Sequence, residues 1–386
     1  MKTKLLLFLI LCSSALFFSQ CVNDVNPVGS DHLNRENPGS LSYQIIQAAV
    51  SDTFFQKTAY TGFSSELSLG TSDNITCLSL IRFSSFSDTV DIDSAVVSLY
   101  VKRVTGNSDD QFTMTVYQAT EDWNESELTW DSFDPNSVGD EIITLTADLT
   151  DIEDDTVSRE ISFQLPTYLV EIWNDTSRSD ENMGMVLSTD ENYILTLHSA
   201  EGSNPPALNI YSHEDTTVSK STKYPSHDTF ISHMELAPTS DRLYVFNGTA
   251  FRTLLYFDVS SIPQEATINR ALITLTTDKD LSFPDNEDAF NLTGVMVTDS
   301  LWTIPDVAYD SLLTNSGLVE DDTAYVNITS YVQNWTSGKD SNCGIMVYGS
   351  NERVNLFGRA FYSTTADSAL RPALEIYFSL PPASQF

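Results

Sequence analysis

Three tryptophans, Trp123, Trp130 and Trp302, lie in loop-like segments that follow predicted strands. Sugar rings present flat C–H faces that dock on Trp and Tyr, and these side chains tolerate a wet cleft because they also carry a polar group. The three residues are therefore candidates for carbohydrate binding. The alternative is that they pack in a core or hold a loop across the end of a sheet, the role we expect for Trp173 and Trp335.

Cations would be needed if such a ligand carried carboxylates, as a uronic-acid polymer does. The candidates in the first half of the chain are Arg82, Lys102 and Arg103, and those in the second half are Arg252 and Arg359. A solvated face is the alternative place for each of them. The formal net charge of −35 also opposes the binding of any polyanion.

Acidic loops supply a second kind of candidate site. Asp151, Glu153, Asp154 and Asp155 lie in one run and offer the hard oxygen ligands that Ca²⁺ prefers. A structural calcium ion is therefore the one cofactor that the sequence suggests. The run lacks EF-hand spacing, and a solvated acidic loop is the alternative.

Motifs typical of enzymes are absent from the sequence. It contains no HExxH, GxSxG, GxGxxG or Walker A spacing. With 54 Asp and Glu residues, paired carboxylates occur by composition alone, so no pair can be assigned as general acid and base. The sequence therefore predicts a protein that is not an enzyme.

Composition limits the class of partner. The chain has 386 residues, with 19 Lys and Arg against 54 Asp and Glu, and its hydrophobic content of 41% is that of a globular protein. Such a negative field would repel a phosphate backbone, so we expect no nucleic-acid partner. The length is typical of two or three domains.

The start of the chain predicts export. Residues 1–4 are short and basic, and the apolar run from Leu5 to Phe18 is too short to span a bilayer, so residues 1–20 have the pattern of a signal peptide. Cys21 follows directly and resembles the lipidated cysteine of bacterial lipoproteins, although Phe18 and Gln20 depart from the usual Leu and small residue.

That resemblance implies a lipid anchor at Cys21, which would be the chain's only contact with a membrane and would hold it at the outer membrane or cell surface. Residues 21–42 have no apolar period and predict a flexible tether. Signal cleavage without a lipid is the alternative. In the body of the chain only Cys77 and Cys343 remain, and we expect them to be unpaired and buried.

Four sequence blocks occur twice, in the same order. Asp52-Thr53-Phe54 returns 176 residues later as Asp228-Thr229-Phe230, and Pro206-Ala207-Leu208 returns as Pro372-Ala373-Leu374. The repetition predicts two related domains in tandem. Their expected bounds are residues 43–212 and 225–380, with a linker over 213–224 and a tail over 381–386.

Both predicted domains consist of short strands. Residues 95–101, 112–117 and 271–276 alternate with period two and are rich in β-branched and aromatic residues, while Gly, Pro, Asn and Asp clusters separate them. Only residues 165–173 and 328–335 have a helical pattern. We therefore expect an all-β protein of two tandem β-sandwich, jelly-roll domains, each with one short helical segment.

Several of these segments resemble the DNRLRE-domain family of secreted β-sandwiches. The resemblance rests on Asp52-Thr53-Phe54, on residues 253–263, on Thr120-Glu121-Asp122-Trp123 and on Arg371-Pro372-Ala373-Leu374. The second copy departs after Trp302, where the continuation to a second Trp is missing. The resemblance implies non-catalytic modules of extracellular bacterial proteins, some of which bind polysaccharides such as alginate.

Two hypotheses about function follow. The first is a cell-envelope lipoprotein whose tandem modules bind a polysaccharide or surface glycan without cleaving it. The second is a structural or adhesive surface protein that binds other proteins or matrix. A group of exposed aromatic side chains on one face would favour the first, and polar faces with an open sheet edge would favour the second.

Overall fold

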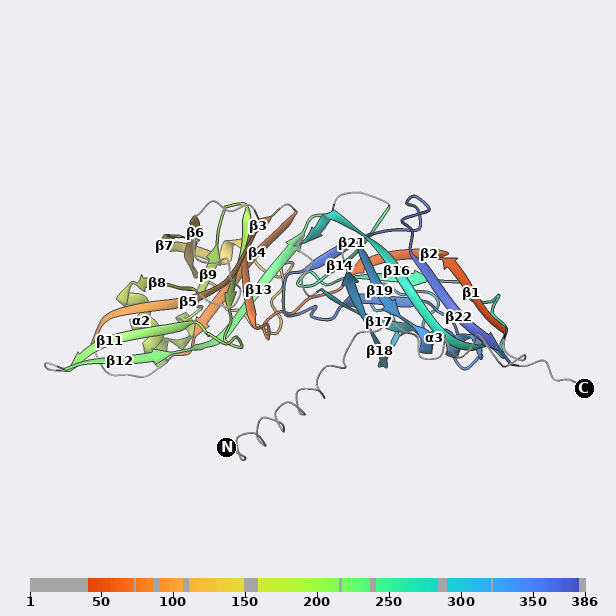
Figure 1. Ribbon diagram of the computed structural model, residues 1–386. Helices are drawn as coiled ribbons and strands as arrows, with labels where there is room; N and C mark the ends of the chain where they lie inside the picture. Colours follow the sequence, from red (N-terminus) through yellow and green to blue (C-terminus); the bar gives the residue numbers. More distant parts are fainter. Residues whose placement is uncertain are drawn as a thin grey trace, which may run out of the picture.

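The computed structural model describes residues 41–72, 74–85, 91–106, 111–148, 159–214, 217–236, 241–283, 290–320 and 322–381. Cys21 and the acidic run 151–155 lie outside these residues. Antiparallel strands make up most of the described chain (Figure 1). The two α-helices within these residues, α2 (Thr167–Asn174) and α3 (Thr329–Thr336), lie where the sequence predicted them. The predicted all-β fold class is confirmed.

One eleven-stranded sheet forms what we call the first unit. Besides α2 it has two short 3-10 turns, at Pro135–Ser137 and Thr176–Glu181. Its strands are β3 (Glu66–Ser72), β4 (Ile75–Phe83), β5 (Ile92–Gly106), β6 (Gln111–Ala119), β7 (Val138–Asp148), β8 (Arg159–Leu165), β9 (Met185–Ser188), β10 (Tyr193–His198), β11 (Ala207–Glu214), β12 (Thr217–Lys223) and β13 (Pro225–Met234).

The other eleven-stranded sheet forms the second unit, and it draws on both ends of the described chain. Its strands are β1 (Leu41–Ala48), β2 (Ser51–Gln56), β14 (Arg242–Phe246), β15 (Phe251–Tyr256), β16 (Thr267–Phe283), β17 (Asn291–Val297), β18 (Tyr309–Glu320), β19 (Thr323–Asn327), β20 (Ile345–Gly349), β21 (Gly358–Tyr362) and β22 (Ala373–Leu380).

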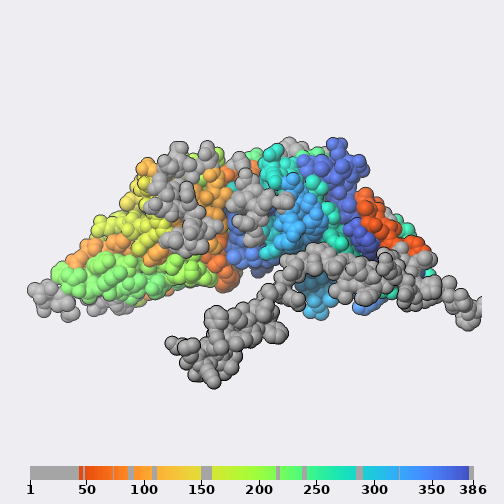
Figure 2. All heavy atoms as spheres, in the orientation of Figure 1, coloured from red at the N-terminus to blue at the C-terminus, as the bar shows by residue number. Residues whose placement is uncertain are grey.

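The two units exchange strands. β1 and β2, at the start of the described chain, pair with β22 and β15 of the second unit. β12 and β13, which follow the middle of the chain, pair with β11 and β4 of the first unit. Figure 2 shows the result, with the red strands at the N-terminal end of the chain packed beside the blue C-terminal part.

This arrangement differs from the domain bounds expected from the sequence. The expected first domain, residues 43–212, includes β1 and β2, which lie in the other sheet, and lacks β13. The expected linker over 213–224 contains β12, which pairs with β11 from Leu208 to Glu214. The reason is that β2 forms its ladder of backbone hydrogen bonds with β15, and β13 forms its ladder with β4.

An aspartate fixes each exchanged strand to a loop of the unit that it joins. The Asp52 carboxylate of β2 accepts a hydrogen bond from the Thr364 N–H at 2.6 Å. The Asp228 carboxylate of β13 accepts one from the Ala200 N–H at 2.7 Å. The recurring Asp-Thr-Phe block of the sequence therefore makes the same contact in both units.

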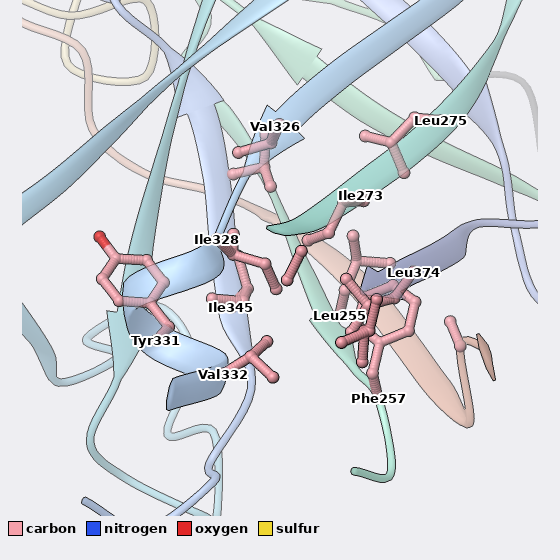
Figure 3. Close-up of a cluster of buried hydrophobic side chains, with 14 of the residues drawn as sticks. Leu255, Phe257, Ile273, Leu275, Val326, Ile328, Tyr331, Val332, Ile345 and Leu374 are labelled. Atoms are coloured by element: carbon pink, nitrogen blue, oxygen red, sulfur yellow. The ribbon is translucent and has the colours of Figure 1, made fainter. Parts of the chain in front are cut away.

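Each unit has its own apolar core. In the second unit, Leu255 and Phe257 face Ile273, Val326 and other side chains around α3 (Figure 3). A corresponding cluster around Trp173 fills the first unit. Cys77 and Cys343 are both free and buried, as predicted.

A third apolar cluster joins the two units. It combines Ile75 and Phe230 of the first unit with Tyr244 and Phe251 of the second, and the exchanged strand β2 adds Phe54. The Arg103 guanidinium also lies 4.5 Å from the centre of the Phe357 ring, across the same boundary. The units therefore share a continuous packed interface as well as exchanged strands.

The described part of the chain contains no helix with both the length and the apolar character needed to cross a membrane.

The strand exchange predicts which fragment of the chain folds. Residues 57–234 contain every strand of the first unit, whereas residues 43–212 lack β13 and carry two strands without partners. We expect the first fragment to unfold cooperatively in urea and the second to show no cooperative transition, because β4 would lose a full ladder of hydrogen bonds. A cooperative transition of 43–212 at the midpoint of 57–234 would contradict the exchange.

Asp228 predicts a pH dependence of stability. Burial raises its pKa from 3.8 to about 7, and Glu201 and Glu125 add to the rise while the Ala200 N–H opposes it. Because the folded pKa lies above the unfolded one, stability falls as the pH rises from about 4 to 7. Asp228→Asn should match the wild type in acid and exceed it at pH 8, by on the order of a few kcal/mol at most. Urea unfolding at pH 5 and pH 8 measures this, and equal differences at both pH values would refute it.

Candidate functional site

A cleft of about 430 Å³ lies where the two units meet. One wall is the segment Gln56–Thr61, which crosses from β2 in the second unit to β3 in the first. The loop 127–132 and strand β13 of the first unit form another wall, and Gly248 and Thr249 of the second unit complete it. The cleft therefore exists only because the chain crosses between the units here.

Two aromatic side chains that line this cleft, Trp130 and Tyr60, are partly exposed, whereas Phe230 is buried in its wall. Trp130 is half-buried and stacks on His233, with ring centroids 5.7 Å apart and planes inclined by 20°. Tyr60 lies on the crossing segment and is 38% exposed. An aromatic face that is neither buried nor free to rotate can receive a sugar ring at little entropic cost.

Local hydrogen bonds explain how Trp130 is held. The Asn124 carbonyl accepts the Leu128 N–H at 2.8 Å, and the Thr129 carbonyl accepts the Phe133 N–H at 3.0 Å. The Ser132 hydroxyl also accepts the Thr129 N–H at 3.0 Å. These turns give the loop a defined shape without regular secondary structure.

The crossing segment is equally well anchored. The Lys57 N–H donates to the Ala250 carbonyl at 2.9 Å, and the Thr61 hydroxyl bonds to the Thr229 hydroxyl at 3.0 Å and to the Phe230 carbonyl. One end of the segment is thus tied to the turn before β15 and the other to β13, both in the second half of the sequence. Tyr60 is held between these two anchors.

Polar groups of both signs surround the aromatic pair. Glu127 and Asp131 are exposed, and the Lys57 ammonium lies 3.4 Å from the Asp306 carboxylate. In the wall, the hydroxyls of Ser232 and Thr249 are buried and have no hydrogen-bond partner among the described residues. The cleft thus offers hydrogen bonding to a hydroxyl-rich ligand and no concentrated positive charge.

The other candidate tryptophans lie elsewhere. Trp123 is only 7% exposed, and its indole N–H donates to the Met183 carbonyl at 2.8 Å, so it holds a loop to the sheet. Trp302 is half-buried beside a different pocket of the second unit. Trp173 and Trp335 are buried, as expected.

The predicted cations are engaged by carboxylates of the protein itself. The Arg82 guanidinium lies 5.1 Å from the Trp123 ring centre and 2.5 Å from the Asp122 carboxylate, whose pKa it lowers through the hydrogen bond. Lys102 and Arg103 both pair with the buried Glu66. None of these three cations lines the cleft.

The two candidates of the second half are likewise internal. Arg252 donates two hydrogen bonds, of 2.8 and 2.6 Å, to the Glu352 carboxylate. Arg359 is 4% exposed and bonds to the carbonyls of Phe283 and Gly358.

The acidic run Asp151, Glu153, Asp154 and Asp155 lies outside the described residues, so the calcium site remains a prediction. Among the described residues no group of three or more His, Cys, Asp or Glu side chains could hold a metal ion.

Of the tryptophans that the sequence put forward, Trp130 lines the cleft, beside Tyr60 and His233, which sequence reasoning did not put forward. Neither residue lies in a recognisable motif, and they are 173 positions apart in the chain. The exchange of β2 and β13 brings them to one cleft. A search for aromatic residues next to the recurring Asp-Thr-Phe block could have found Tyr60. That Tyr60 lies in the same cleft as Trp130 and His233 is decided by the tertiary structure.

Comparison with known proteins adds one family. Residues 44–156 match the profile of Carbohydrate-binding module family 96. The comparison with curated proteins gives no match. Among solved structures, the chain aligns with the Macrobrachium rosenbergii nodavirus structure at 11% identity, over 90% of this chain and 92% of that chain, with a TM-score of 0.12. So low a score supports no structural likeness. The family match includes both the crossing segment and the Trp130 loop.

The unpaired hydroxyl of Thr249 predicts a gain of stability on its removal. Thr249→Val should stabilise the free protein by about 1 kcal/mol, because a buried polar group without a partner costs free energy. Thr253→Val is the matched control, since the Thr253 hydroxyl donates to the Tyr244 carbonyl at 3.0 Å and its loss should destabilise the protein. Urea midpoints of both variants test the difference, and a loss of stability in both would refute it.

Proposed function

We propose that this protein binds polysaccharide without cleaving it, and that the cleft between the units is a binding site. The observation that carries the proposal is that the carbohydrate-binding family match, residues 44–156, supplies Tyr60 and Trp130 to the same cleft. Its volume of about 430 Å³ is within the range of small-molecule sites. The two sheet units would then act as related modules, as the recurring sequence blocks suggest.

The charge around the cleft favours an uncharged glycan. Glu127 and Asp131 can accept hydrogen bonds from sugar hydroxyls, whereas they would repel the carboxylates of a polyuronate. The cations put forward from the sequence are paired with carboxylates of the protein, as Arg82 with Asp122 and Arg103 with Glu66 are. Lys57, which lines the cleft, lies beside the Asp306 carboxylate. The net charge of −35 acts in the same direction.

Binding without turnover agrees with the setting of these carboxylates. A glycosidase needs one carboxylic acid kept protonated, usually by an apolar, water-excluded site. Glu127 and Asp131 are exposed side chains on the rim of an open cleft. The proposed role of the cleft is therefore recognition.

We place the protein in the cell envelope as a lipoprotein anchored at Cys21. The strand exchange gives this proposal a geometric consequence, because β1 starts at Leu41, opposite Leu380 of β22. A tether that ends there would connect the lipid to the second unit. The first unit, with the Trp130 loop, would then be the unit farther from the anchor.

Affinity electrophoresis of residues 43–380 tests the proposed function. Gels would contain a neutral β-glucan, a galactomannan, a xylan or the polyuronate alginate. We expect retardation by at least one neutral polymer and none by alginate. Trp130→Ala and Tyr60→Ala should each weaken binding roughly tenfold, since one aromatic platform contributes about 0.5–1.5 kcal/mol beyond its buried area.

Tyr168→Ala is the matched control, because Tyr168 is 57% exposed on α2 and does not line the cleft. Its mobility should equal that of the wild type. Retardation that survives both cleft substitutions would remove the cleft from the proposal. Absence of retardation by every polymer would favour the structural or adhesive alternative.

A further inference from the structure

A second pocket, of about 310 Å³, lies in the second unit away from the cleft. It lies beside the turn that carries Leu301 and Trp302, which follows β17. Leu301 is 84% exposed. Trp302 has a φ of 48°, and among the described non-glycine residues only Ala250 also has a positive φ. The residues that line it include Ser51, Tyr256, Ser300, Leu301, Trp302 and Asn342.

Trp302 is held in the same way as Trp123 of the first unit. The Trp302 indole N–H donates to the Cys343 carbonyl at 2.7 Å, and the Trp123 indole N–H donates to the Met183 carbonyl at 2.8 Å. An asparagine precedes each accepting residue, Asn342 before Cys343 and Asn182 before Met183. Each asparagine side chain donates to a backbone carbonyl at the end of a strand, that of Phe257 or Phe83. The two tryptophans therefore occupy corresponding places.

The neighbours of the two rings differ. In the first unit, β13 pairs with β4 so that His227 lies opposite Arg82, and both side chains pack on the Trp123 ring. In the second unit, β2 pairs with β15 in the same register, but Ser51 lies opposite Tyr256. The guanidinium and imidazole that cover Trp123 have no counterpart at Trp302, and the pocket occupies that place.

The chemistry of the pocket fits a sugar ring. Trp302 and Leu301 offer an apolar surface, while Ser51, Ser300 and Tyr256 carry hydroxyls that can bond to a ligand. No Lys or Arg lines the pocket. We propose that it is a second binding site, for an uncharged sugar ring that stacks on Trp302 and is oriented by the hydroxyls of Tyr256 and Ser51.

The choice of a sugar as ligand rests on the proposed function, but the site itself is separate from the cleft. Each unit would then contribute one aromatic platform, Trp130 in the cleft and Trp302 in the pocket. Two platforms on one chain would raise the affinity for a polymer above that for a short oligosaccharide.

Fluorine NMR of protein labelled with 5-fluorotryptophan separates the two sites, because the five tryptophans give five signals. The Trp302 and Trp130 signals are identified by their loss in Trp302→Phe and Trp130→Phe. Cellohexaose, mannohexaose and xylohexaose are the probes, titrated to millimolar concentration. We expect at least one of them to shift the Trp302 signal saturably.

Tyr256→Arg should weaken this response roughly tenfold, because an arginine there can cover the Trp302 ring as Arg82 covers Trp123. Tyr224→Arg is the matched control, since Tyr224 is 59% exposed and lines neither pocket. A Trp302 signal that no probe moves, or that moves equally in Tyr256→Arg, overturns the second site. If the Trp130 signal still responds in that case, the proposed function of the cleft stands. A response of the Trp302 signal alone would support the pocket and count against the cleft.

Discussion

The structure depends on the ladders of hydrogen bonds that β2 and β13 form outside their own half of the chain. An unpaired strand edge exposes a row of backbone donors and acceptors, so each strand needs a partner. β2 finds its partner in β15 and β13 finds its partner in β4, each in the other half of the sequence. The half-buried carboxyl group of Asp52 and the buried one of Asp228 each accept a hydrogen bond from a loop of the sheet that the strand joins. Each sheet is therefore completed by a strand that comes from the other half of the sequence.

The cleft follows directly from this exchange. The chain must cross from β2 to β3, and the crossing segment carries Tyr60 past the Trp130 loop. The apolar cluster around Phe230, Tyr244 and Phe251 packs the two units against each other beside the cleft. A ligand in the cleft would therefore meet a preorganised surface, which lowers the entropic cost of binding.

The cations put forward as ligand contacts from the sequence are used inside the protein. Arg103 and Lys102 neutralise the buried Glu66, and Arg252 neutralises Glu352 in the second unit. A buried carboxylate without a partner would be costly, so these cations are committed to the fold. The cleft offers a ligand hydroxyls, exposed carboxylates, aromatic faces and one ammonium group, that of Lys57 beside Asp306, and this set suits uncharged sugars better than polyanions.

The sequence by itself determined the fold class and the location of both helices, because period-two alternation and the helical segments at 165–173 and 328–335 are local patterns. It also showed the recurring blocks, since these need only comparison along the chain. Only the tertiary structure decided which sheet each block joins: Ser51–Gln56 and Pro225–Met234 suit the edges of β4 and β15 equally well as sequences, and local pattern does not encode the partner of a strand. The exposure of each tryptophan was decided in the same way. Trp123 and Trp302 lie in similar loops, but strand pairing places Arg82 and His227 on one ring and leaves Tyr256 and Ser51 beside the other.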